Sequence, residues 1–221
     1  MPMKHFAFID CFINDPANHC VNDIALKNKI TASYHMPSKF GFNSLKALSH
    51  VDGFIILGSA SHISEKLKWH KELLDFIIPQ IEKNIPTLGI CFGHQLIADY
   101  YGCEIDYIQK DKKIFSVTRE LNFKEDFGFI KKETKLSLGY AHAQIVKNIS
   151  DRFTVIAKSS EFEFEALKHK EYKFYSFQAH PEASEDFLIN EASISSQIEA
   201  EKIKSYGDLI ISNFITLAKK D

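Results

Sequence analysis

The first hundred residues alternate between short apolar runs and amphipathic segments, and this order constrains the fold more than any other feature. The runs His5–Ile9, Phe54–Leu57 and Thr87–Ile90 predict buried strands. Helical spacing of apolar residues follows two of them, over Glu65–Asn84 and Gly93–Tyr101. Strands and helices that take turns in this way favour a parallel sheet with helices on both faces. We therefore predict an α/β protein with three layers, α/β/α, around a central, mostly parallel sheet.

The rest of the chain has a looser pattern. We expect loops at Asn14–Asn22 and Ser184–Ser196, and a long amphipathic helix at Ser195–Lys219. Pro79 should kink or split its helix, and Gly207 should interrupt the C-terminal one. Further strands are predicted at Thr31–Met36, Ile114–Thr118, Phe153–Ala157, Phe162–Leu167 and Tyr172–Phe177.

The composition is that of an ordinary globular protein, with 45% apolar and 25% charged residues among 221. The 27 Lys and Arg residues nearly balance the 29 Asp and Glu residues, which argues against a nucleic acid or an anionic membrane as the main partner. Four cysteines are too few for a disulfide-stapled fold, and no apolar stretch reaches the ~18 residues of a membrane span. Because no repeat or composition shift occurs, we expect one domain over residues 1–221, in the cytoplasm and with reduced thiols.

The most specific motif is Gly89-Ile90-Cys91-Phe92-Gly93, which follows a predicted strand and opens a predicted helix. This is the nucleophile-elbow pattern with cysteine in place of serine. A nucleophile at such a sharp turn has a strained backbone and needs small neighbours, which the two glycines provide. The thiol then lies at a helix N-terminus, where the dipole stabilises a thiolate. The alternative is that Cys91 is a small core residue between two packing glycines.

A second motif supplies the groups that a cysteine nucleophile needs. His180-Pro181-Glu182 follows the predicted strand Tyr172–Phe177. A cysteine needs a base, and the base needs an acceptor that orients it, so His180 and Glu182 fit these two roles. In an extended segment, residues two apart share one side, which lets His180 face Cys91 while Glu182 holds its other ring nitrogen. Together the motifs predict a Cys-His-Glu triad.

The two motifs resemble the signatures of class I glutamine amidotransferases, which use such a triad. The similar stretches are GICFGHQLIADYYG at Gly89–Gly102 and FQAHPE at Phe177–Glu182. The resemblance covers nearly the whole chain, and it is strongest to free-standing domains similar to the glutaminase part of GMP synthetase. It implies a flavodoxin-like α/β fold with the active site at the carboxyl ends of the parallel strands.

The resemblance also implies a role for each member of the triad. Cys91 would attack the γ-carboxamide of glutamine and form a glutamyl thioester. His180 would take the thiol proton and then give it to the departing ammonia, while Glu182 would orient and polarise His180.

Further residues of the site follow from the same resemblance. The backbone N–H of Phe92, with one in the turn of Gly58 and Ser59, would form the oxyanion hole. Gln95 matches a position that contacts bound glutamine. The segment whose backbone holds the amino-acid end of the substrate matches Tyr140, Ala141 and His142. Many relatives have a second glycine where this chain has Ser59, so the second oxyanion donor departs from the family pattern.

Metal and nucleotide chemistry are not predicted. Cys91 and His94 have a C-x-x-H spacing that could suggest zinc, but no second pair of ligands follows. The chain lacks a glycine-rich phosphate loop, so we expect no use of ATP and no other cofactor.

Three functions remain open at this point. The first is an amidotransferase that releases ammonia from L-glutamine for an acceptor on a separate synthetase subunit. The second is a γ-glutamyl hydrolase that cleaves a γ-glutamyl amine or conjugate with the same triad; Gln95 favours glutamine over this reading. The third is a non-catalytic regulatory binding module, against which the intact triad argues.

Overall fold

The computed structural model describes residues 3–14, 16–192 and 194–219. Within these ranges the strands are β1 His5–Ile9, β2 Thr31–His35, β3 Gly53–Ile56, β4 Thr87–Ile90, β5 Glu104–Tyr107, β6 Phe115–Phe123, β7 Lys135–His142, β8 Gln144–Asn148, β9 Phe153–Lys158, β10 Ala166–His169 and β11 Phe174–Phe177. The helices are α1 His19–Asn28, α2 Pro37–Phe40, α3 Asn43–Lys46, α4 Lys68–Glu82, α5 Phe92–Tyr100, α6 Glu185–Asn190 and α7 Gln197–Ala218, with a 3₁₀ turn η1 at Ile63–Glu65.

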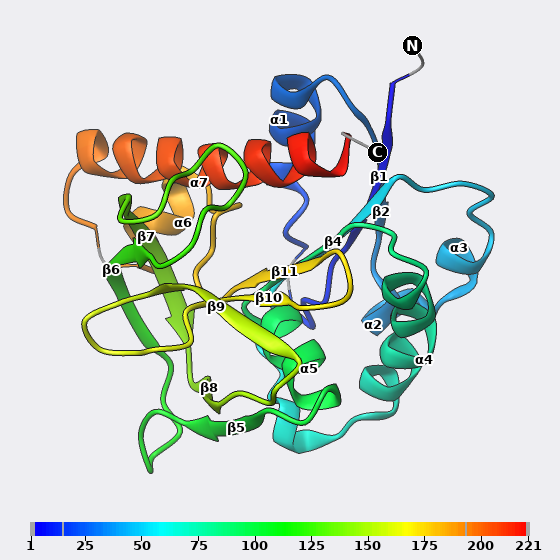
Figure 1. Cartoon of the computed structure of the whole chain (residues 1–221), viewed down its shortest axis with the longest axis horizontal. Coiled ribbons are helices and arrows are strands. Elements are labelled where there is room, and N and C mark those ends of the chain that lie inside the picture. The colour runs from blue at the N-terminus through cyan, green and yellow to red at the C-terminus, as the bar shows by residue number, and fades with distance from the viewer. Residues whose placement is uncertain (1–2, 15, 193, 220–221) are drawn as a thin grey trace.

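A mixed sheet has the strand order β2-β1-β3-β4-β11-β10-β9-β6-β7, and β5 pairs separately with β8 (Figure 1). β2, β1, β3, β4 and β11 are parallel neighbours, and β10, β9, β6 and β7 continue the sheet in antiparallel pairing. The α/β fold with helices around a largely parallel centre is confirmed, and the antiparallel half is what the sequence pattern did not predict. Because β3, β4 and β11 are parallel neighbours, their carboxyl ends meet at one edge of the sheet.

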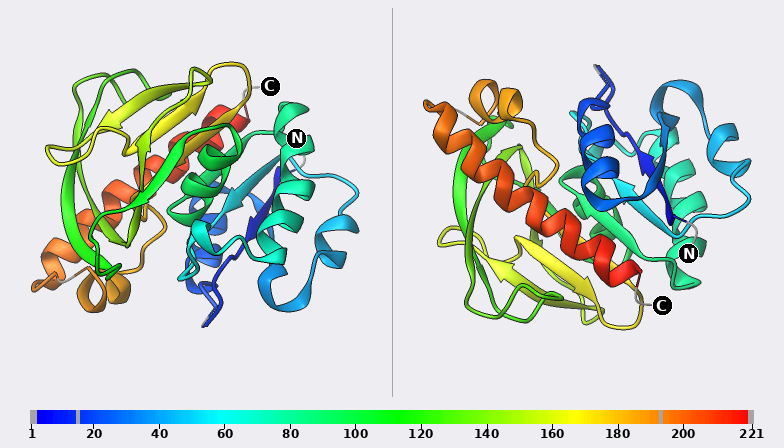
Figure 2. Two further views of the ribbon diagram at one scale, coloured as in Figure 1. Left: turned by 90° about the horizontal axis from the view of Figure 1, so that it is seen from below. Right: turned by 90° about the horizontal axis from the view of Figure 1, so that it is seen from above.

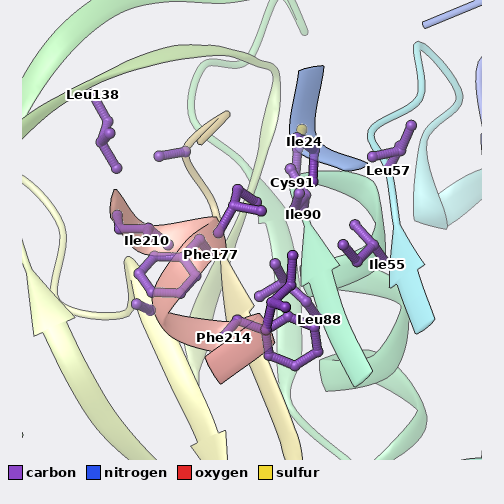
Figure 3. Packing of buried hydrophobic residues seen from close by; sticks show 14 of the residues in the cluster. Ile24, Ile55, Leu57, Leu88, Ile90, Cys91, Leu138, Phe177, Ile210 and Phe214 are labelled. Carbon is purple, nitrogen blue, oxygen red and sulfur yellow. The ribbon is translucent and has the colours of Figure 1, made fainter. Parts of the chain in front are cut away.

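Both faces of the parallel half are covered by helices, as the apolar strands require. Along β1, Phe6 and Phe8 belong to the core formed with α1 and α7, whereas Ala7 and Ile9 belong to the core formed with α4 and α5. Figure 2 shows α7 crossing one face of the sheet. Figure 3 shows Phe214 of this helix in the cluster that also holds residues of β3 and β4. The three predicted layers are therefore present.

The helix α1 begins in a segment that we expected to be a loop. α1 begins at His19, inside Asn14–Asn22, and its buried residues Cys20, Val21 and Ile24 pack toward the sheet. Their spacing is that of a short amphipathic helix, but the polar residues before it outweighed this signal in the sequence pattern. The loop prediction was wrong over this part of the segment.

Neither predicted helix is split. α4 runs from Lys68 to Glu82 with Pro79 inside its last turn, so the split expected there was wrong, whereas a kink at Pro79 stays a prediction. α7 is continuous through Gly207, where a Cβ would lie 2.3 Å from the carbonyl oxygen of Pro181. Gly207 therefore allows a close approach between α7 and the His-Pro-Glu segment. In the described part of the chain, no helix is long and apolar enough to cross a membrane.

Candidate active site

The elbow around Cys91 has the geometry that its glycines predict. β4 ends at Ile90, α5 begins at Phe92, and Cys91 joins them with φ 48° and ψ −97°. This positive φ is strained for a residue with a side chain. A Cβ at Gly89 would lie 2.8 Å from the carbonyl oxygen of Gly93, and only glycine leaves the turn this tight. The Cys91 side chain thus lies at the positive end of α5, where an anion is stabilised.

Strand pairing brings the His-Pro-Glu segment to Cys91. Phe177, at the end of β11, pairs in parallel with Ile90, and its carbonyl accepts a 2.8 Å hydrogen bond from the Cys91 N–H. Figure 3 shows Phe177, Ile90 and Cys91 in the same packed region. The His180 N–H then donates to Gly139 O of β7 at 2.9 Å. His180 therefore follows the strand that is the immediate neighbour of the elbow.

His180 and Glu182 form the predicted pair, with His180 Nδ1 donating to Glu182 Oε1 at 2.9 Å. Both side chains are at least nine-tenths buried. The pair spans a turn, in which Ala183 N–H bonds to His180 O, and does not lie along an extended segment as we expected. Glu182 reaches back to the imidazole because the chain reverses at Pro181.

The imidazole is arranged to hold a proton. Burial lowers the pKa of His180, but the Glu182 carboxylate and the Cys91 side chain oppose this effect, and the net pKa is well above the usual histidine value. Glu182 occupies Nδ1, whereas Nε2 has no hydrogen-bond partner in the described structure. This free nitrogen is the one available to exchange a proton with a nucleophile.

Gly58 shows how closely the elbow and the base approach each other. A Cβ at Gly58 would lie 2.9 Å from His180 Cε1 and 3.6 Å from Cys91 Cβ. The turn after β3 thus packs against both candidate catalytic side chains, where an oxyanion donor would have to lie. Ser59 Oγ accepts a 3.0 Å hydrogen bond from Ser61 N–H, which orders this turn.

We expect Gly58→Ala to lower kcat by roughly 10²–10³-fold, because the added methyl group displaces the His180 ring and the proposed oxyanion donor together. Its effect on folding should be small in comparison, since Gly58 needs no positive φ. The measurement is kcat at saturating substrate beside the thermal unfolding midpoint. A folded Gly58→Ala protein with wild-type kcat would show that this turn has no part in the reaction.

A cavity of about 380 Å³ opens beside His180 and Glu182. Ser59, Ala60 and Ala141 also line it, and the β1–α1 connection, the start of α1, Ile114 and the region of α6 supply the rest of the wall. A cavity of about 630 Å³ between α3 and α4 is larger, but it does not border the triad. The smaller cavity is therefore the candidate substrate site, because it alone of the two reaches reactive groups.

Sequence reasoning missed the contribution of α6 to this site. The Phe187 ring lies 5.0 Å from the His180 ring, so it packs against the candidate base. α6 lies within Ser184–Ser196, which we expected to be a surface connection. Ser184 caps it by accepting a 3.2 Å bond from the Phe187 N–H, and two acidic residues follow in the first turn. This N-cap pattern is the signal that could have identified the helix.

The predicted substrate-binding side chains are mostly buried away from solvent. Gln95 Nε2 donates to Gln144 O at 2.6 Å and to Gln178 Oε1 at 3.0 Å. Tyr140 and His142 are also buried, and among the residues matched to substrate contacts Ala141 borders the cavity. The Ala141 carbonyl oxygen lies 4.0 Å from Cys91 Sγ. A backbone contact to substrate from this segment stays a prediction, as does the role of Gln95.

His94 is turned away from the candidate nucleophile. Its Nδ1 pairs with Ser176 Oγ at 2.8 Å, and burial lowers the pKa of this histidine to about 3. Over the described ranges, no three His, Cys, Asp or Glu side chains gather as ligands of a metal ion would.

Comparison with known proteins places these features in one family. The sequence profile of "Glutamine amidotransferase class-I" matches residues 9–187. The chain is 35% identical to a glutamine-hydrolyzing GMP synthase subunit of Pyrococcus abyssi over 122 residues, which are 53% of this chain and 64% of that protein. It is 29% identical to "Gamma-glutamyl peptidase 4" of Arabidopsis thaliana over 153 residues, which are 67% of this chain and 61% of that protein. The chain thus spans less than two thirds of the length of these relatives.

Solved structures share the fold at low sequence identity. A glutamine amidotransferase from Thermotoga maritima superposes with a TM-score of 0.76 at 16% identity, and all of both chains is covered. A glutamine amidotransferase from Methylobacillus flagellatus gives a TM-score of 0.75 at 15% identity, over 97% of this chain and 95% of that one.

Proposed function

The chain belongs to the class I glutamine amidotransferase family, and on this premise we propose that it hydrolyses the γ-carboxamide of L-glutamine through a thioester on Cys91. The ammonia released would pass to an acceptor on a separate synthetase subunit. The observation that supports this most is the meeting of Cys91, the Glu182-paired His180 and Gly58 at one edge of the sheet.

In the first half of the proposed reaction, His180 Nε2 holds the proton from the Cys91 thiol. The thiolate attacks the carbonyl carbon of the γ-carboxamide, a C–S bond forms, and the carbonyl oxygen becomes an oxyanion. The Phe92 N–H at the start of α5 and a donor in the turn of Gly58 and Ser59 stabilise that charge. His180 then gives its proton to the nitrogen, the C–N bond breaks, and ammonia leaves.

In the second half, water hydrolyses the thioester. His180 takes a proton from the water, whose oxygen attacks the same carbon. The C–S bond breaks, glutamate leaves, and the Cys91 thiolate returns beside the imidazolium. Glu182 stabilises the imidazolium in both halves, which agrees with the raised pKa of His180.

A second candidate is a γ-glutamyl hydrolase that acts on a γ-glutamyl amine or conjugate. Two observations favour considering it: the similarity to a protein named a gamma-glutamyl peptidase, and the cavity of about 380 Å³ beside His180. Ammonia is about the size of a water molecule, whose share of liquid volume is about 30 Å³, whereas the leaving group of a conjugate is larger and would have to share this cavity with the glutamyl group. A non-catalytic binding module is less well supported, because it has no chemical need for the paired triad.

The direct test mixes the purified chain with L-glutamine and, separately, with several γ-glutamyl amides, and follows glutamate together with the released amine. Turnover of glutamine supports the amidotransferase. Fast cleavage of substituted amides with no turnover of glutamine supports the hydrolase instead.

We expect the isolated chain to be slow on glutamine and to be stimulated by its partner. A misplaced oxyanion donor costs roughly 10²–10³-fold in kcat, and Ser59 stands where many relatives have glycine. A synthetase subunit that docks over the carboxyl edge of the sheet would favour the conformer of the Gly58–Ser59 turn in which the backbone N–H points at the oxyanion. The measurement is glutaminase kcat of the chain alone and with a candidate synthetase subunit. Full, unstimulated activity of the chain alone would disprove this coupling.

A further inference from the structure

A closed ring of buried polar contacts joins segments of the candidate site that lie far apart in the sequence. It passes through residues of β6, β7, β8 and α5, through the residue just before β10 and through the residue just after β11. Its members are Arg119, His142, Gln144, Gln95, Gln178 and Glu165. All six are buried.

Arg119 is the only cation in this ring, and its guanidinium makes polar contacts with His142, with Glu165 and, outside the ring, with Glu161 Oε2 at 3.8 Å. Nη2 donates to His142 Nε2 at 2.7 Å, and Nε lies 3.1 Å from Glu165 Oε1. The guanidinium also lies over the ring of Tyr140 at 3.9 Å and over that of Phe162 at 4.7 Å. A lysine could not make both polar contacts and stack on two rings, because its charge is a single point.

The contact with Arg119 fixes the protonation of His142. A guanidinium only donates, so Nε2 must accept, and Nδ1–H then donates to Gln144 O at 2.9 Å. Burial and the charge of Arg119 lower the pKa of His142 to about 3, so it stays neutral over the physiological range. The same Gln144 oxygen accepts the 2.6 Å bond from Gln95 Nε2, which links the segment to the elbow helix.

The other half of the ring returns through Gln178. Gln95 Nε2 also donates to Gln178 Oε1 at 3.0 Å, and Gln178 N–H donates to Glu165 O at 2.8 Å. Glu165 pairs with Arg119 and closes the ring. Stability alone does not explain this arrangement, because apolar residues in place of a buried ion pair are often as stable or more stable.

We propose that Arg119 is a positioning residue for the reaction: through His142 and Gln144 it holds the Ala141 segment in register with Cys91 and Gln95. This proposal rests on the proposed function, in which that segment holds the amino-acid end of the γ-glutamyl substrate. Arg119 makes no contact with a triad side chain in the described structure, and Cys91 and His180 are held by the pairing of β4 with β11, by Glu182 and by the bond from His180 N–H to Gly139 O of β7. The ring thus sets substrate binding more than the chemical step.

The test replaces both charges at once, in the double variant Arg119→Met and Glu165→Met, because a single change would leave one charge buried and unpaired. We expect the double variant to fold, with KM for glutamine raised about tenfold and kcat changed much less. The rate of Cys91 alkylation by iodoacetamide, followed against pH, should match the wild type. Arg152→Met is the matched control, because Arg152 makes an exposed ion pair with Glu171, and it should leave every value unchanged.

An unchanged KM in the folded double variant would overturn the proposal. A fall in kcat as large as the rise in KM, together with an altered pH dependence of Cys91 alkylation, would also overturn it, because the ring would then support the triad. If the double variant does not fold, His142→Phe opens the ring while keeping the ion pair, and the same rise in KM is expected from it. A wild-type chain that does not turn over glutamine contradicts the proposed function instead, so the two failures are distinguishable.

Discussion

Cys91→Ser will abolish turnover while the protein remains folded, with a loss in kcat of roughly 10⁴-fold or more. The hydroxyl is close in size to the thiol, so the packing of the elbow is preserved. It is far less acidic, so His180 cannot generate the anion that attacks the carbonyl carbon of the γ-carboxamide. The measurement is glutamate release at saturating substrate, beside the thermal unfolding midpoint.

Cys103→Ser is the matched control for this experiment. Cys103 is also buried and free, but it lies near Ser150 and away from the candidate site. We expect it to keep wild-type activity. Full turnover by a folded Cys91→Ser protein would remove Cys91 from its assigned role, and equal losses in the two variants would point to a general effect on folding.

His180→Ala will cost more in kcat than Glu182→Gln. Loss of the base removes the proton transfer itself, at roughly 10⁴–10⁶-fold, whereas loss of an orienting acid costs about one to two powers of ten less. Glutamine at position 182 can still accept a bond from Nδ1 through its amide oxygen. Glu182 raises the pKa of His180, so the Glu182→Gln change should let His180 lose its proton at lower pH. In a plot of the Cys91 alkylation rate against pH, the step that reports this loss should move to lower pH.

The comparison uses kcat at saturating glutamine for both variants, with His50→Ala as an exposed-histidine control. Equal and complete losses in two folded proteins would mean that Glu182 does more than orient the imidazole. Wild-type kcat in Glu182→Gln would reduce the 2.9 Å pair to a structural contact.

The parts of the site that sequence reasoning predicted are those with a local signature. The elbow at Cys91 follows from two glycines within a five-residue motif, and a histidine with an acid two positions later identifies the partner segment. Short apolar runs likewise predicted β1, β3 and β4, because each run is a signal within a few consecutive residues. Each of these signals lies within a short stretch of consecutive residues.

The parts that it missed depend on contacts between distant segments. Arg119 and Glu165 occupy different parts of the chain, and each alone has the pattern of an ordinary surface charge until the sheet brings them together. A glycine within a helical pattern predicts a break, so Gly207 was misinterpreted; the structure shows that it allows Pro181 to pack closely against α7. The antiparallel half of the sheet escaped for a related reason, since its strand pairing depends on tertiary contacts more than on local preference.

The most direct test of the central claim is affinity labelling with a glutamine analogue that carries a chloromethyl ketone in place of the γ-carboxamide. A nucleophile that attacks the carboxamide carbonyl carbon of bound glutamine should be alkylated by this analogue, one group per chain. The account predicts a single label, mapped by peptide mass to Cys91. Glutamine, or a γ-glutamyl amide that the protein cleaves, should slow the labelling, and asparagine should not. A label on another residue, or labelling of Cys91 that no γ-glutamyl compound slows, would contradict it.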